Sequence, residues 1–221
     1  MIIGASYASP GGTTYAGAAY VVFGANGGFA ASIATSSLNG TNGFQLAGVS
    51  PGDRAGYSVS GIGDFNGDGF SDVIVGAPFA DPNGATSGEA YVVYGTNAGM
   101  PANLNLSGLN GANGFTIEGL SGNDYAGWSV RDGGDVNGDG LSDIVMSASG
   151  ASPNGVSGAG ATYVVFGSNG VGASLDLGAL DGSNGFVVNG FQANSFTGFA
   201  ADSAGDVDGD GYGDIVIGGT D

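Results

Sequence analysis

Three nine-residue windows rich in aspartate hold the side chains best suited to chemistry. They are DFNGDGFSD at Asp64–Asp72, DVNGDGLSD at Asp135–Asp143 and DVDGDGYGD at Asp206–Asp214, spaced 71 residues apart. Each window has oxygen-bearing side chains at positions 1, 3, 5 and 9 and glycine at positions 4 and 6. Calcium favours six to eight oxygen ligands at about 2.3–2.6 Å in flexible geometry. Alternate positions of a tight loop can direct several carboxylates to one centre, and glycine permits the bend.

The spacing therefore predicts three calcium sites, one in each loop. The backbone carbonyl at position 7 and water would complete each ligand set. The third loop has aspartate at position 3 where the others have asparagine, so we expect it to bind calcium most tightly. The expected ligands are Asp64, Asn66, Asp68, Phe70 and Asp72; Asp135, Asn137, Asp139, Leu141 and Asp143; and Asp206, Asp208, Asp210, Tyr212 and Asp214.

Three other interpretations of these windows are weaker. An EF-hand needs flanking helices and a glutamate at position 12, whereas here the last aspartate leads into an apolar run such as DVIVGAP. Magnesium demands stricter octahedral geometry and retains its waters. Metal-free turns would leave at least three carboxylates in nine residues repelling one another, in three loops in register.

The elements that must position these loops recur with the same period. GAAYVVFG, GEAYVVYG and GATYVVFG begin at Gly17, Gly88 and Gly160, and LNGTNGF, LNGANGF and LDGSNGF recur at intervals of 71 residues. Alternation and β-branched or aromatic residues predict strands at Asp72–Ala77, Glu89–Tyr94, Phe115–Gly119 and Gly127–Gly133 in the middle repeat. Clusters such as DPNGATSG separate them as turns, and no stretch has an apolar helical period.

The expected fold is all-β, with tandem four-stranded antiparallel blades of the β-propeller type. The chain is interpreted as one repeat region over residues 1–221. Its repeats cover approximately 1–72, 73–143 and 144–214, and residues 215–221 begin a further repeat. Closed propellers usually have about four to eight blades, so we expect other blades, subunits or fibre neighbours to complete the assembly.

The repeated segments resemble the FG-GAP repeat family, found in the propeller of integrin alpha subunits and in many bacterial surface proteins. GYSVSGIGDFNGDGFSDVIVGAP at Gly56–Pro78 follows the family pattern nearly throughout. The resemblance implies a β-propeller whose blades carry a calcium loop between adjacent strands. The sequence departs from the pattern at the "FG" pair, which is AG, AG and TG, and the "GAP" triplet is complete only at Gly76–Pro78.

Composition excludes several classes of function. The chain has 20 acidic residues and only Arg54 and Arg131 as cations, so it lacks the basic footprint that nucleic acids need. No apolar run is long enough to insert in a membrane. The chain lacks histidine, cysteine and lysine, which removes the usual bases, thiolates and zinc ligands, and half of its acids lie in the three loops. We therefore expect no enzymatic activity.

Two non-catalytic hypotheses follow. The first is a calcium-binding adhesion or ligand-binding propeller segment, extracellular or on a cell surface, with a protein or carbohydrate ligand. The second is a structural unit that self-associates through edge strands, head to tail, into a calcium-stabilised extracellular fibre or array. Extracellular calcium modules bind at about 0.1–1 mM, which suits an outside location.

Overall fold

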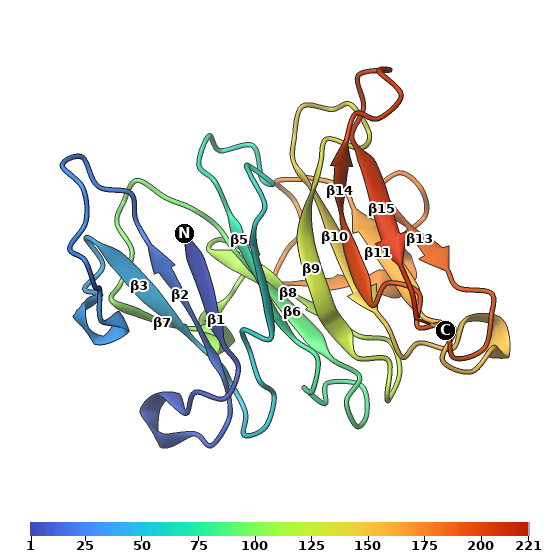
Figure 1. Cartoon of the computed structure of the whole chain (residues 1–221), viewed down its shortest axis with the longest axis horizontal. Coiled ribbons are helices and arrows are strands. Elements are labelled where there is room, and N and C mark those ends of the chain that lie inside the picture. The colour runs from blue at the N-terminus through green and yellow to red at the C-terminus, as the bar shows by residue number, and fades with distance from the viewer. Residues whose placement is uncertain (221) are drawn as a thin grey trace.

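The computed structural model describes residues 1–220 as an all-β chain of four sheets that follow one another from the N-terminus to the C-terminus (Figure 1). The strands are β1 (Ile2–Ala5), β2 (Ala18–Val22), β3 (Gly43–Ala47), β4 (Ser58–Gly61), β5 (Val73–Ala77), β6 (Glu89–Val93), β7 (Asn103–Asn105), β8 (Gly114–Glu118), β9 (Ala126–Gly134), β10 (Asp143–Ala148), β11 (Ala161–Val165), β12 (Ser174–Asp176), β13 (Gly185–Asn189), β14 (Ala200–Gly205) and β15 (Asp214–Gly218).

The second and third sheets show the repeating unit most completely. The antiparallel strands β4-β5-β6-β8 form one, and β9-β10-β11-β13 form the other. The first sheet contains β1-β2-β3, and the described part of the fourth is the hairpin β14-β15. This arrangement of consecutive antiparallel sheets is propeller-like and confirms the all-β expectation. The repeat boundaries expected at residues 72, 143 and 214 fall at the end of the loop that joins the first two strands of a sheet. Of the further repeat expected to begin at 215–221, the structure describes residues up to 220.

The four strands predicted for the middle repeat are confirmed to within one residue at each end, as β5, β6, β8 and β9. Two further strands were not predicted. β7 and β12 have three residues each and pair in parallel with β3 and β8 of the preceding sheet. A three-residue segment is too short for alternation to identify. Each of these strands belongs to one repeat and adds an edge strand to the sheet of the repeat before it, next to β3 or β8.

Helical structure among residues 1–220 is confined to 3-10 turns: η1 (Pro10–Gly12), η2 (Thr35–Ser37), η3 (Leu106–Gly108), η4 (Pro153–Gly155) and η5 (Leu177–Ala179). Asn105 and Asp176 cap η3 and η5 by accepting a hydrogen bond from the backbone N–H two residues later. None of the described helices could cross a membrane.

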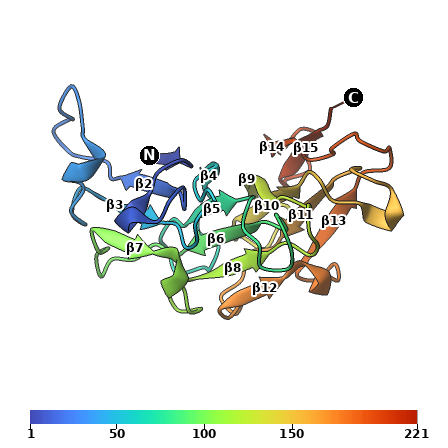
Figure 2. The ribbon, with the colours of Figure 1, turned by 90° about the horizontal axis from the view of Figure 1, so that it is seen from below.

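The hydrophobic core lies between neighbouring sheets, which face each other in Figure 2. Successive residues of a strand point to opposite faces, so Ile74 packs toward the third sheet while Val75 packs toward the first. Phe115 is fully buried between the second and third sheets, with its ring 5.5 Å from Phe65 and 6.0 Å from Tyr94. Both faces of the second sheet are therefore apolar.

Glycine brings the backbones of adjacent repeats into contact. Gly17, Gly88 and Gly160 precede β2, β6 and β11, and all three have positive φ angles, between 77° and 82°. A β-carbon on any of these glycines would overlap the backbone of the segment that enters the next sheet. The residues it would meet are Ala55, Ala126 and Thr197, respectively. The abundance of glycine thus reflects inter-repeat packing as well as turns.

We expect Phe115→Ala to destabilise the chain by about 3–5 kcal/mol, because it leaves a cavity between two sheets. Urea unfolding followed by intrinsic fluorescence would measure the loss. Phe191→Ala is the matched control, since Phe191 is 89% exposed, and it should change the midpoint little. Equal effects of the two substitutions would contradict the packing described here.

Candidate functional site

The three aspartate-rich loops have the same backbone hydrogen-bond pattern. They connect β4 to β5, β9 to β10 and β14 to β15, and all three lie along the same side of the molecule, at the top of Figure 1. In the first loop, Asp64 Oδ1 accepts hydrogen bonds from the N–H groups of Gly67 and Asp68 at 2.8 and 3.1 Å, and Oδ2 accepts from Gly69 at 2.8 Å. Asp135 and Asp206 make the same three bonds in their loops. The position-1 carboxylate therefore closes each loop around itself.

Positions 3 and 5 distinguish the third loop from the first two. Asn66 and Asn137 donate from Nδ2 to the position-5 carboxylate, at 3.1 Å to Asp68 and 2.8 Å to Asp139. The third loop has Asp208 instead, which has no such donor. Carboxylate oxygens of Asp206, Asp208 and Asp210 lie within 4.8 Å of one another and are exposed. This crowding of carboxylates is suited to a hard divalent cation.

The position-9 aspartates of the first two loops are buried. Asp72 Oδ2 accepts from Phe65 N at 3.0 Å, and Oδ1 accepts from Gly95 N at 2.8 Å. Asp143 makes the equivalent bonds to Val136 and Gly167. Burial raises the pKa of Asp72 to about 6 and raises that of Asp143 as well, although these backbone N–H bonds oppose the shift. Each aspartate ties its loop to the end of the third strand of its own sheet.

The structure thus brings together the predicted side chains at positions 1, 3 and 5 of each loop. The aspartate at position 9 anchors the loop instead. In the third loop, Asp214 accepts a hydrogen bond from Val207 N at 2.7 Å, and its carboxylate lies outside the cluster of Asp206, Asp208 and Asp210. At position 1, Oδ1 accepts two hydrogen bonds and Oδ2 accepts one, so a lone pair of Oδ2 remains for a metal ion. The donor set, of carboxylate and amide oxygens around a glycine-bent turn, fits calcium. The anchoring role of position 9 was not foreseen from the sequence.

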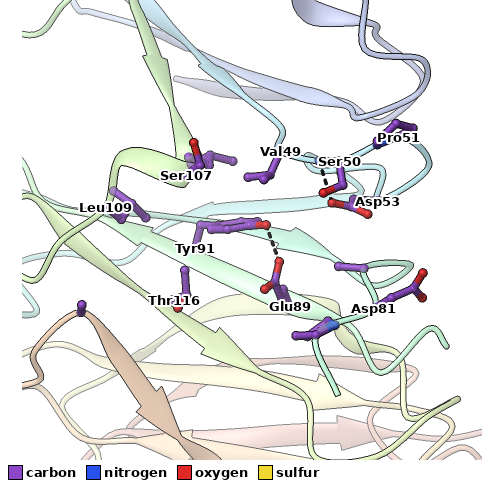
Figure 3. Close-up of a pocket in the computed structure, with 14 residues that line it drawn as sticks. Val49, Ser50, Pro51, Asp53, Asp81, Glu89, Tyr91, Ser107, Leu109 and Thr116 are labelled. Atoms are coloured by element: carbon purple, nitrogen blue, oxygen red, sulfur yellow. Dashed lines mark hydrogen bonds between the residues drawn. The ribbon is translucent and has the colours of Figure 1, made fainter. Parts of the chain in front are cut away.

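A second feature, also missed from the sequence, is an acidic cavity of about 440 Å³ between the first and second sheets. Asp53, Asp81, Glu89 and Tyr91 line it, and the Tyr91 hydroxyl donates a hydrogen bond to Glu89 (Figure 3). Burial is the main cause that raises the pKa of Glu89, and the nearby charges of Asp53 and Glu118 raise it further.

A second inter-sheet cavity, of about 490 Å³ between the second and third sheets, has the same framework. Tyr163, Leu177 and Asp124 occupy the positions of Tyr91, Leu106 and Asp53. In this second cavity, Ser152 and Ala161 stand where the first cavity has the acidic residues Asp81 and Glu89. Packing between sheets therefore does not require those two acids.

Comparison with known proteins assigns these repeated sheets to a family. The FG-GAP repeat matches residues 55–93 and 126–165, which run from the start of the first strand of a sheet through its Asp-rich loop to the third strand. The chain belongs to the FG-GAP repeat family. Each matched FG-GAP segment includes one complete Asp-rich loop.

Several curated proteins share this FG-GAP similarity. The chain is 38% identical over 95 residues to "Integrin alpha pat-2" of Caenorhabditis elegans, covering 43% of the chain and 7% of that protein. It is 34% identical over 102 residues to "Integrin alpha-E" of Mus musculus, covering 43% and 8%. It is 31% identical over 169 residues to "Phosphatidylinositol-glycan-specific phospholipase D" of Bos taurus, covering 76% and 19%. The chain spans less than a fifth of the length of each.

The cavity yields a prediction on pH dependence. Because the folded-state pKa of Glu89 is raised, its contribution to stability is greatest below its unfolded-state pKa and is lost as pH rises through its folded-state pKa. Glu89→Gln keeps an acceptor for the Tyr91 hydroxyl and removes this penalty. Relative to the original chain, the variant should become more stable as pH rises from 4 to 7, by about 1.4 kcal/mol per unit of pKa shift.

Thermal unfolding in a chelator at several pH values would measure this effect without contributions from bound cations. Glu118→Gln is the comparison, because it makes the same chemical change at the cross-strand neighbour of Glu89. It removes only the smallest of the causes that raise the pKa of Glu89, so it should change the pH dependence less than Glu89→Gln does. A stability difference between Glu89→Gln and the original chain that does not vary with pH would contradict the prediction.

Proposed function

We propose that each of the three loops binds one calcium ion and that the chain is a calcium-rigidified, non-catalytic, ligand-binding β-propeller segment located outside the cell. The observation that carries this proposal is the loop geometry repeated three times, with position 1, 3 and 5 side chains gathered on each turn. The carboxylates of Asp206, Asp208 and Asp210 converge without a neighbouring side-chain donor, and a divalent cation would offset their repulsion.

The ligands of each ion would be the side chains at positions 1, 3 and 5, the carbonyl at position 7 (Phe70, Leu141 or Tyr212) and water. The position-9 carboxylate, which lies outside the cluster in the third loop, would complete the set through a water molecule. The ion would supply charge neutralisation and a cross-link within one hairpin. Because the ligands converge only when the hairpin is formed, binding would stabilise the folded state selectively. Asp72, Asp143 and Asp214 would preorganise the loops by holding the N–H groups of Phe65, Val136 and Val207.

Calcium should therefore raise the melting temperature. Sites with dissociation constants of about 0.1–1 mM would each add roughly 1.4–2.7 kcal/mol of stability at about 10 mM calcium. Differential scanning calorimetry in a chelator, in calcium and in magnesium would measure the shift. A chain lacking Asp64, Asp135 and Asp206, each replaced by asparagine, is the control. An unchanged melting temperature of the original chain in calcium would refute the proposal.

The third loop should bind most tightly, because Asp208 adds a charge that Asn66 and Asn137 lack. Substitution of Asn137 by aspartate should raise the calcium affinity of the second loop, and Asp208→Asn should lower that of the third, each by about tenfold. Isothermal titration calorimetry at fixed ionic strength would measure both changes. If neither substitution changed the calcium dissociation constant of its loop, the side chain at position 3 would not be a ligand.

The proposed ligand-binding role rests on the integrin alpha relatives. Ligands in this proposal are proteins, with carbohydrate as the alternative, and the same relatives support a cell-surface or extracellular location. The proposal is non-catalytic although one relative is named as a phospholipase, because similarity covers only 19% of that protein. The chain's lack of histidine, lysine and cysteine leaves few groups for acid–base or nucleophilic chemistry.

A second candidate is a self-associating structural unit. Within residues 1–220, β1 pairs only with β2 and β15 only with β14, so each has an edge free for another strand. Electron microscopy at millimolar calcium distinguishes the candidates. Periodic filaments support the structural unit, and closed discs or monomers support the propeller segment.

A further inference from the structure

Neighbouring Asp-rich loops contact each other through their backbones. The Ser142 N–H group, at position 8 of the second loop, donates a hydrogen bond of 3.1 Å to the carbonyl of Asp64, at position 1 of the first. The Gly213 N–H group donates in the same way to the carbonyl of Asp135, at 2.7 Å. The acceptor residue in both pairs is the one whose carboxylate closes the preceding loop. The same contact thus recurs at both junctions.

Side chains reinforce these backbone contacts. A β-carbon on Gly67 would lie 3.2 Å from Leu141 Cδ2, and a β-carbon on Gly138 would overlap the ring of Tyr212. Gly67 and Gly138 occupy position 4, and Leu141 and Tyr212 occupy position 7 of the following loop. The position-4 glycine therefore permits the bend of its own loop and makes room for a side chain from the next repeat.

Positions 7 and 8 consequently serve two loops at once. In the proposed function, the residue at position 7 offers its carbonyl to its own site. Its side chain lies against the preceding loop, and the next residue donates a hydrogen bond to position 1 of that loop. Ordering this segment in one loop should reduce the entropy still to be lost when the adjacent loop is ordered, which favours binding there. Repulsion between ions in adjacent exposed loops would oppose this effect, but it is screened at physiological ionic strength.

We propose that the calcium sites are coupled in series, with Leu141–Ser142 positioning the first site and Tyr212–Gly213 positioning the second. This inference rests on the proposed function, since it concerns the same three loops. Calcium in one loop strengthens binding in its immediate neighbour. Because coupling is reciprocal, it acts in both directions along the row. The first and third loops influence each other only through the second.

Site-resolved NMR titration tests the coupling. The amide signals of Gly67, Gly138 and Gly209, at position 4 of each loop, report calcium binding to the three loops separately at physiological ionic strength. Tyr212→Ala should weaken the second site by about fivefold, the low end of typical couplings, and weaken the first site much less, because the third loop reaches it only through the second. Tyr212→Phe should restore the second site, because it retains the ring over Gly138.

Phe70→Ala is the matched control, because it makes the equivalent change at position 7 of the first loop, which has no preceding Asp-rich loop among residues 1–220. It should leave the second and third sites unchanged. The pair Asp206→Asn and Asp208→Asn removes ligands of the third site without altering Tyr212, and it should also weaken the second site about fivefold.

The outcomes separate the two proposals. The coupling would be overturned, with calcium binding left intact, if the calcium affinity of the second site changed neither with Tyr212→Ala nor with the loss of the third site. No response of any of the three glycine signals to calcium would overturn the proposed function itself. Weakening of the first site as large as that of the second by Tyr212→Ala would indicate a general loss of structure and would also overturn a coupling that acts between neighbours.

Discussion

The need of the second and third sheets to bury both of their apolar faces governs the arrangement. The strands of the second sheet alternate residues such as Ile74 and Val75, which pack in opposite directions, so this sheet requires a partner on either side. Stacking successive repeats meets this requirement without any large insertion or helix. It also fixes the direction in which the first strands β4, β9 and β14 follow one another. Since each Asp-rich loop leaves one of these strands, the loops are placed in a row by the packing of the core.

The buried aspartates at position 9 connect that core to the exposed loops. Asp72 and Asp143 lie at the start of their second strand, and each joins two other segments of its sheet through backbone N–H groups. Their burial raises their pKa, so retaining the charged form there is costly, and several hydrogen bonds offset part of this cost. The exposed side chains at positions 1, 3 and 5, which are the proposed ligands, thus rest on a buried and hydrogen-bonded base, as a preorganised binding site requires.

The sequence predicted the strands of the middle repeat closely because their apolar runs recur with a constant period and are separated by Asn-Gly turns. It also predicted which side chains gather at positions 1, 3 and 5, because the loop is local and its geometry follows from the glycines. It did not predict β7 or β12, which depend on pairing with a strand of the preceding sheet. The acidic cavity was also missed, because Asp53 and Glu89 are distant in sequence and meet only when two sheets pack.

The contact between position 4 of one loop and position 7 of the next has a consequence for variation among repeats. Gly138 lies under the Tyr212 ring with a φ of 77°, which side chains rarely adopt, so it must remain glycine both for the bend of its own loop and for the ring of the next. Position 4 is glycine in all three loops, whereas position 7 is phenylalanine, leucine or tyrosine. Leu141 and Tyr212 therefore meet the same open space on a preceding loop. Whole repeats could accordingly be exchanged or duplicated without a clash at the new junction, provided that this glycine is kept.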